Sequence, residues 1–233
     1  MPDYTEPWNG TVPRSRLLDA LSLLLPAAET FVISTLTEWR KEDAHRIDPR
    51  MGEEIDRFIR EEQAHQRAHE RYNLGLIMAS PGAATAAKRA AHAADDLASL
   101  SLTTRMALCA AFEQLTSVVS HELLERGFLL RDEASPHARL WRWHAREEID
   151  HCHVALEAAA LCGVGRIRRT LALVAGATLL SFDVLVGTAR LCRIDIKAGA
   201  NRWVVWRDSF SLVARSLPAL ARMARASLRC AAA

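Results

Sequence analysis

The chain has 233 residues, of which 50% are hydrophobic, and only 10 are glycine and 8 proline. This length suffices for one domain with a sizeable core, and the scarcity of Gly and Pro favours long helices over a strand-and-turn fold. The formal net charge is only +2 and the basic residues are dispersed among acids, which excludes the concentrated basic face of a typical nucleic-acid-binding protein.

Helical spacing of apolar residues and capping signals predict four long helices. Pro26 is interpreted as the start of the first helix, because proline favours the first helical position. Asp48-Pro49 and Ser135-Pro136 each place a capping residue before a proline, and they are expected to start the second and fourth helices. The expected ranges are about 26–44, 48–78, 102–128 and 135–161.

An Ala-rich segment, 83–97, follows a Pro-Gly break and is expected to cross over between the two halves of a bundle. Further helices are expected at the C-terminus, the last of them basic, amphipathic and broken at Pro218. The predicted fold is all-α: a ferritin-like four-helix bundle with a crossover helix and additional C-terminal helices. The predicted divisions are an N-terminal segment 1–25, the bundle 26–162 and a C-terminal helical extension 163–233.

A lone Glu followed some thirty-odd residues later by Glu-x-x-His occurs twice in the chain. Positions i and i+3 of a helix lie on one face, so each motif aims a carboxylate and an imidazole at the same point. Four inward carboxylates and two histidines from four helices form the di-iron or di-manganese site of a ferritin-like bundle. The alternative is a set of surface residues on amphipathic helices. The six residues are Glu29, Glu62, His65, Glu113, Glu148 and His151.

In this interpretation the lone Glu of each copy binds one ion, the motif Glu bridges or chelates, and each motif His supplies one nitrogen per ion. His69 and His144 share the motif faces and are expected to add a donor to each ion, with a hydrogen-bonded core role as the alternative. Glu61 and Glu147 each precede a motif Glu, where an acid is placed to hold a histidine of the other copy. A solvated face paired with arginines is the alternative for these two acids.

Three patterns around these residues, together with Glu113, match a known family. They are Pro26-x-x-Glu29-x-Phe31, Phe58-Ile59-x-x-Glu62-x-x-His65-x-x-x-His69-x-x-Tyr72-Asn73 and Trp143-His144-x-x-Glu147-Glu148-x-x-His151. Over roughly residues 24–161 the chain resembles a bacterial, ferritin-like family labelled predicted metal-dependent hydrolase, although Ala28 stands where many relatives have Gly. His144 is also similar to the extra histidine ligand of the di-iron arylamine N-oxygenases, a resemblance that implies dioxygen activation.

We therefore expect a non-haem di-iron oxygenase that activates dioxygen to oxidise a small, largely apolar organic substrate. Its cofactors would be two Fe ions, with Mn or Zn as alternatives, and it would need an electron donor. The first alternative is a two-metal-dependent hydrolase, and the second is a non-catalytic metal-binding protein. No catalytic residue is expected beyond the metal ligands. The oligomeric state is not predicted, and a homodimer is one of the alternatives.

The cysteines are odd in number and form no CxxC pair, so reduced thiols and a cytoplasmic location are expected. The segment 170–182 carries no charge, and 201–233 carries six arginines against one acid, Asp208. These features favour helices that cover the bundle, with peripheral membrane contact through the C-terminal helices as the first alternative. The second is a membrane-spanning helix, which would place Asp183 inside the bilayer at considerable cost.

Overall fold

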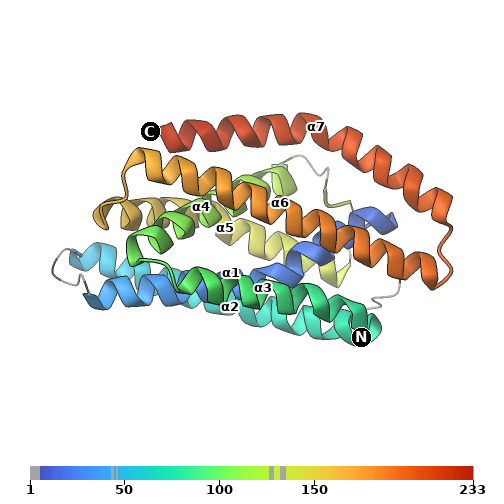
Figure 1. Ribbon diagram of the computed structural model, residues 1–233, viewed down its shortest axis with the longest axis horizontal. Coiled ribbons are helices and arrows are strands. Elements are labelled where there is room, and N and C mark those ends of the chain that lie inside the picture. Colours follow the sequence, from blue (N-terminus) through green and yellow to red (C-terminus); the bar gives the residue numbers. More distant parts are fainter. Residues whose placement is uncertain (1–5, 43–44, 46, 126–128, 132–134, 233) are drawn as a thin grey trace.

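The computed structural model describes residues 6–42, 45, 47–125, 129–131 and 135–232, and within them the chain is all-helical (Figure 1). Within these described residues it forms seven α-helices and no strand, and a short 3-10 helix, Pro81–Ala83, precedes the third of the α-helices. The last residues expected in the first and third helices, 43–44 and 126–128, lie outside it. The α-helices are α1 Val12–Glu42, α2 Pro49–Ala79, α3 Ala84–Ala98, α4 Leu102–Glu125, α5 Pro136–Leu161, α6 Arg166–Lys197 and α7 Arg202–Ala232.

Side-chain caps confirm the predicted starts of α2 and α5. The Asp48 carboxylate accepts a hydrogen bond from the Met51 N–H at 2.9 Å, and the Ser135 hydroxyl accepts one from the Ala138 N–H at 3.0 Å. Each bond satisfies an N–H that the first turn of a helix leaves without an internal acceptor.

The predicted start of the first helix at Pro26 is wrong, because α1 begins at Val12 and continues through this proline. A proline has no N–H, so the carbonyl of Ser22, four residues earlier, loses its helical partner. Asn73 of α2 supplies the missing donor: its Nδ2 donates to the Ser22 carbonyl oxygen at 2.8 Å. A neighbouring helix therefore compensates for the proline.

The predicted break at Pro218 is also wrong, since α7 continues through it. Buried residues on both sides of this proline, Leu212 and Ala219, hold α7 against the rest of the molecule. Arg222 adds a bidentate ion pair to Glu122 of α4, with N–O distances of 2.9 and 2.8 Å. These contacts keep α7 continuous through Pro218, where helix propensity alone would favour a break.

Four helices, α1, α2, α4 and α5, enclose the centre of the molecule, and α3 connects the α1–α2 pair to the α4–α5 pair (Figure 1). α3 has no buried residue and packs along α1. α6 covers α1 and α4, and α7 lies outermost against α6. The main core cluster joins α1, α2, α4 and α5 through residues such as Leu36, Trp39, Phe58 and Met106. This arrangement aims one face of each of the four enclosing helices at a common centre.

Candidate metal centre

The structure brings all eight candidate ligands together at the centre of the four helices, and none of them is more than 3% exposed. α1 and α4 contribute one carboxylate each, while α2 and α5 contribute one carboxylate and two histidines each. We call these residues the eight-residue cluster. They are Glu29, Glu62, His65, His69, Glu113, His144, Glu148 and His151.

The ligand atoms of the cluster fall into two groups, within each of which they lie no more than 4.8 Å apart. Glu113 lies beside the larger group, with its Oε2 3.9 Å from His151 Nδ1. Both motif histidines belong to this larger group, and the assignment of one of them to each ion stays a prediction. The larger group is Glu62, His65, Glu148 and His151, and the smaller is Glu29, His69 and His144.

Many polar atoms of the cluster are buried and make no well-formed hydrogen bond within the described residues, although some lie at ion-pair distance, such as His151 Nδ1 and Glu62 Oε1 at 2.7 Å. Leaving such groups unpaired is costly, and buried carboxylates in particular are retained only when they are paired or bind a metal. The donor set of carboxylate oxygens and imidazole nitrogens suits iron, manganese or zinc. These residues therefore fit a pair of metal ions. The atoms are both oxygens of Glu29, Glu62 and Glu113, Oε2 of Glu148, Nδ1 of His65, His144 and His151, and Nε2 of His69.

The electrostatics of the cluster without metal favour bound protons. Burial raises the pKa of Glu29 and of Glu113 well above the usual range, and the charge of nearby Glu62 raises both further. Burial opposes a charge on His65, but the carboxylates of Glu148 and Glu62 outweigh it and raise the pKa of His65 to about 11. Protons on these groups occupy the positions that metal ions would take, so metal binding must displace them.

Each motif histidine is held by an acid from the other copy of the motif. His65 Nε2 lies 2.8 Å from Glu147 Oε2, and Trp143 Nε1 donates to the other oxygen of Glu147 at 2.8 Å. His151 Nε2 lies 3.1 Å from Glu61 Oε2. A proton on Nε2 leaves Nδ1 of each ring directed at the cluster, which is the carboxylate–histidine arrangement that orients metal ligands.

His69 is oriented by a different set of hydrogen bonds, which involves the carbonyl that Pro26 leaves without a helical partner in α1. Because Asn73 Nδ2 donates to the Ser22 carbonyl, its Oδ1 is left to accept from the Ser22 hydroxyl at 2.8 Å. This bond uses the one hydroxyl proton of Ser22, so His69 Nδ1, 2.8 Å from Ser22 Oγ, must be the donor. His69 Nε2 then keeps its lone pair, and burial lowers the pKa of His69 to about 3. His69 is thus a neutral nitrogen donor of fixed tautomer.

Sequence reasoning gave no role to Ser22 and placed Asn73 only within a family pattern. The signal that could have found Ser22 is its position four residues before Pro26, where a helix carbonyl must lose its partner. The identity of the replacement donor depends on how α1 and α2 pack, which no local pattern encodes.

Aromatic rings enclose the histidines and limit access for water. Phe58 packs on His151 with ring centroids 4.6 Å apart, and Trp141 packs edge-on against His69 at 5.1 Å. In such a site, charges interact more strongly than they would in water.

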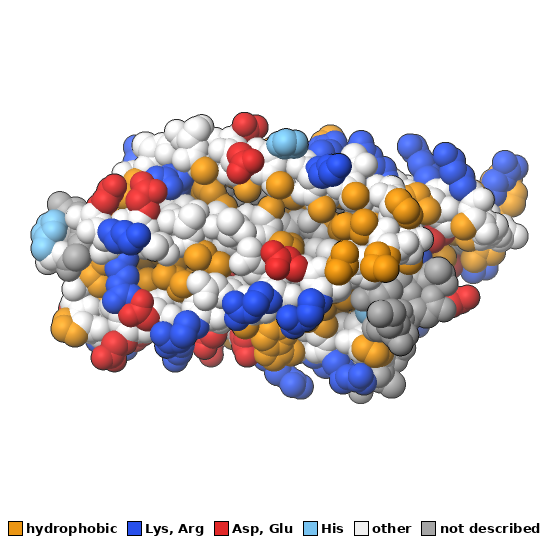
Figure 2. Space-filling view, turned by 90° about the horizontal axis from the view of Figure 1, so that it is seen from below, with side chains coloured by type: hydrophobic (Ala, Val, Ile, Leu, Met, Phe, Trp, Pro, Cys, Tyr) orange, Lys and Arg blue, Asp and Glu red, His pale blue; other side chains and the backbone are white. Residues whose placement is uncertain are grey.

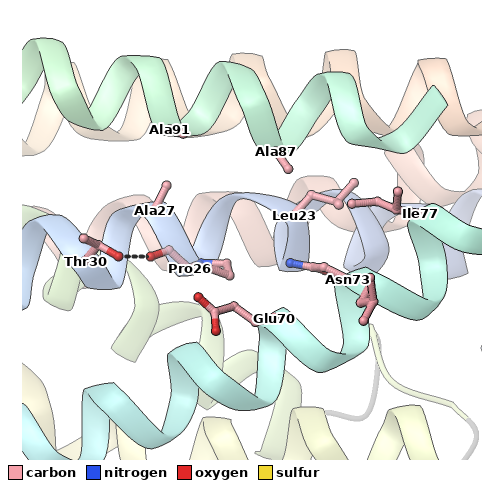
Figure 3. A pocket seen from close by; sticks show the side chains of 10 residues that line it. Leu23, Pro26, Ala27, Thr30, Glu70, Asn73, Ile77, Ala87 and Ala91 are labelled. Atoms are coloured by element: carbon pink, nitrogen blue, oxygen red, sulfur yellow. Dashed lines mark hydrogen bonds between the residues drawn. The ribbon is translucent and has the colours of Figure 1, made fainter. Parts of the chain in front are cut away.

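A cavity of about 370 Å³ lies between α1, α2 and α3 (Figure 3). Figure 2 views the molecule from below, the side of α2 and α3, where apolar side chains form patches between charged ones. None of the eight cluster residues lines the cavity, but Asn73 both lines it and supports Ser22 and His69. The lining residues are Leu23, Pro26, Ala27, Thr30, Glu70, Asn73, Leu74, Ile77, Ala87 and Ala91.

Comparison with protein families gives a match to the model described as "Predicted metal-dependent hydrolase", over residues 2–230. Neither the comparison with curated proteins nor that with solved structures gives a match. The matched range is longer than the 24–161 that the sequence patterns covered, and it includes α6 and nearly all of α7.

Proposed function

Because the chain belongs to the predicted metal-dependent hydrolase family, we propose that it binds two metal ions at the eight-residue cluster, within a ferritin-like bundle, and hydrolyses a small, largely apolar substrate. The observation that carries the proposal is the buried set of carboxylate and imidazole atoms from four helices, which face one another at short distances and leave most of their lone pairs without a hydrogen-bond donor. When bound, two such ions lower the pKa of a water and polarise the bond that it attacks. The family favours this chemistry over the oxidation that the sequence analysis put first.

The protein residues orient the histidine ligands and exclude bulk water from the site. Glu61 and Glu147 orient the motif histidines, and Ser22 orients His69. The low exposure of the cluster keeps bulk water from competing for the ions. Among the described residues, the proposed substrate class is joined to this chain by one contact only: Asn73, which supports Ser22 and His69, also belongs to the mostly apolar lining of the open cavity beside the cluster.

Oxidation with dioxygen is a second candidate, and the donor set favours it. Four carboxylates accompany the four histidines of the cluster, and such oxygen-rich sets bind iron in ferritin-like oxidases. The rings of Phe58 and Trp141 against the histidines also suit chemistry that must exclude water. This candidate requires an electron donor as a partner.

Metal analysis followed by two assays separates the candidates. The protein is purified without oxygen, its metals are measured, and samples reloaded with zinc, manganese or iron are tested on a panel of esters and phosphodiesters. Hydrolysis by the loaded protein that is lost in Glu62→Gln supports the proposal. Oxygen consumption by the iron form, with no hydrolysis by any form, supports the second candidate. Absence of bound metal after reloading rejects both.

A further inference from the structure

The outermost helix, α7, is apolar on two opposite sides. Val205, Leu212 and Ala219 recur every seven residues and are buried against the molecule. A second stripe, about 140° away around the helix at 100° per residue, faces outward. Its members are Trp203, Trp206, Phe210, Val213 and Leu217, each at least 55% exposed.

α6 carries an outward apolar stripe of the same kind. It is long and apolar enough to span a membrane, yet only 17% of its most apolar window is buried. The stripe follows one face at spacings of three, four and eight residues. Its members are Ile167, Leu171, Val174, Phe182 and Leu185, each at least 55% exposed. Exposed apolar surface of this extent marks a site of interaction with a partner or a membrane.

Positive charge accompanies these stripes. From residue 201 to 233 there are six arginines and one acid, Asp208. Arg207 is paired with Asp208 at 2.9 Å and Arg222 with Glu122 of α4, so these two contribute less to the charge of the surface than the others. Arg166 and Arg168 are exposed in the first turn of α6. Arg202 lies over the ring of Trp203, 4.9 Å from its centroid. Exposed tryptophan and phenylalanine beside arginine are typical of helices that lie in the interface of an anionic membrane.

Ion pairs to the bundle oppose insertion of α6 across a bilayer. Asp195 of α6 binds Arg16 of α1 through two bonds of 2.7 and 2.9 Å, and Asp183 binds Arg89 of α3 at 2.7 Å. Spanning would break these pairs and place Asp183 within the hydrocarbon, which is costly. Surface contact leaves both pairs intact.

We propose that the outward stripes of α6 and α7 bind the surface of a membrane that contains anionic lipids. A second copy of the chain fits this surface less well, because a symmetric contact would bring the arginines of both copies together. Anionic headgroups pair with the arginines while the aromatic rings enter the boundary with the acyl chains.

The test is flotation with vesicles of phosphatidylglycerol and phosphatidylcholine in equal parts, compared with pure phosphatidylcholine. We expect binding to the mixed vesicles at low salt, loss of binding at high salt, and little binding to phosphatidylcholine alone. The double variant Trp206→Ser, Phe210→Ser should weaken binding about tenfold or more, because two exposed rings no longer enter the interface. Met78→Ser, at an equally exposed position on α2, should bind like the wild type.

Four outcomes overturn the proposal. No binding to the mixed vesicles, or equal binding by the double variant whose helicity matches that of the wild type, excludes these stripes as the membrane contact. A dimer without lipid that the double variant converts to a monomer identifies the surface as a contact between copies. Binding that resists both high salt and alkaline carbonate shows a spanning segment.

Discussion

Asn73 of α2 donates to the Ser22 carbonyl of α1 at 2.8 Å, replacing the helical bond that Pro26 removes. The same two residues share a second bond of 2.8 Å between their side chains, and this bond decides which nitrogen of His69 carries the proton. A local defect in a helix is thereby coupled to the chemistry of a candidate metal ligand 47 residues away in the chain.

Ser22→Ala should alter the smaller ligand group and leave the larger one intact. The change removes the acceptor of His69 Nδ1, so the ring no longer has one preferred tautomer. We expect cobalt-loaded Ser22→Ala to bind one ion normally and a second about tenfold more weakly, with altered visible absorption bands. Ser34→Ala, another hydroxyl on α1 that bonds only its own helix, is the control. Wild-type spectra and affinities in Ser22→Ala would show that His69 binds no metal.

Glu147→Gln should weaken metal binding while keeping the fold. An amide holds the His65 N–H less strongly than a carboxylate does, and loss of such a partner costs about tenfold to a hundredfold in metal affinity. Competition with a chelating dye measures the effect. Glu53→Gln, at an exposed position on α2, should bind as the wild type does. Identical affinities in the two variants would remove Glu147 from the site.

Glu62→Gln and Glu148→Gln should each remove most of both ions. The two carboxylates lie in the larger group, where their oxygens are 3.4 and 3.3 Å from His65 Nδ1. Removing one negative ligand therefore weakens the whole group. Metal content measured after dialysis should fall in both variants and stay at two ions per chain in Glu53→Gln. Full occupancy in both ligand variants is incompatible with the assignment.

Metal affinity should rise with pH. The pKa of His65, raised to about 11 by Glu148 and Glu62, means that its ring holds a proton at neutral pH in the metal-free protein, and burial shifts the pKa of Glu29 and Glu113 in the same direction. Metal binding releases those protons, so a lower proton concentration favours the bound form. Calorimetry in two buffers of different ionisation enthalpy should show net proton release near pH 7. Proton uptake, or affinity that falls between pH 6 and pH 8, would contradict this electrostatic description.

Asp195→Asn should destabilise the protein far more than Asp208→Asn. Arg16 is 2% exposed, and loss of a buried partner leaves its charge only partly compensated by Asp19. We expect a decrease of about 3 kcal/mol in the free energy of unfolding. Asp208 pairs with the exposed Arg207, so its substitution should cost less than about 1 kcal/mol. Urea denaturation measures both, and equal effects would show that the Arg16 pair does not hold α6.

The starts of α2 and α5 could be predicted because the capping interactions that define them are local. Asp48 and Ser135 cap helices through bonds to residues three positions ahead, so a short window of sequence contains the whole interaction. Pro26 and Pro218 misled the prediction for the opposite reason. Whether a helix continues through a proline depends on contacts with distant segments, such as Asn73 for α1.

The convergence of the candidates on α2 and on α5 toward one helix face also followed from local spacing. Three or four residues separate neighbouring candidates on α2 and on α5, and such residues share a helix face. The division into two groups did not follow, because it depends on how far each helix projects into the centre. The assignment of His65 and His151 to different ions stays a prediction; the structure places their ring centroids 5.5 Å apart within the larger group.

The exchange of acids between the two motifs makes the halves of the bundle depend on one another. Glu61 serves His151 and Glu147 serves His65, so neither helical pair completes its own ligands. A chain cut in the turn between α3 and α4 would give two fragments that bind metal poorly when separate and well when mixed. Metal binding would then measure how much of the two fragments has reassembled. In the intact protein, tight metal binding would require that both halves are already packed against each other correctly.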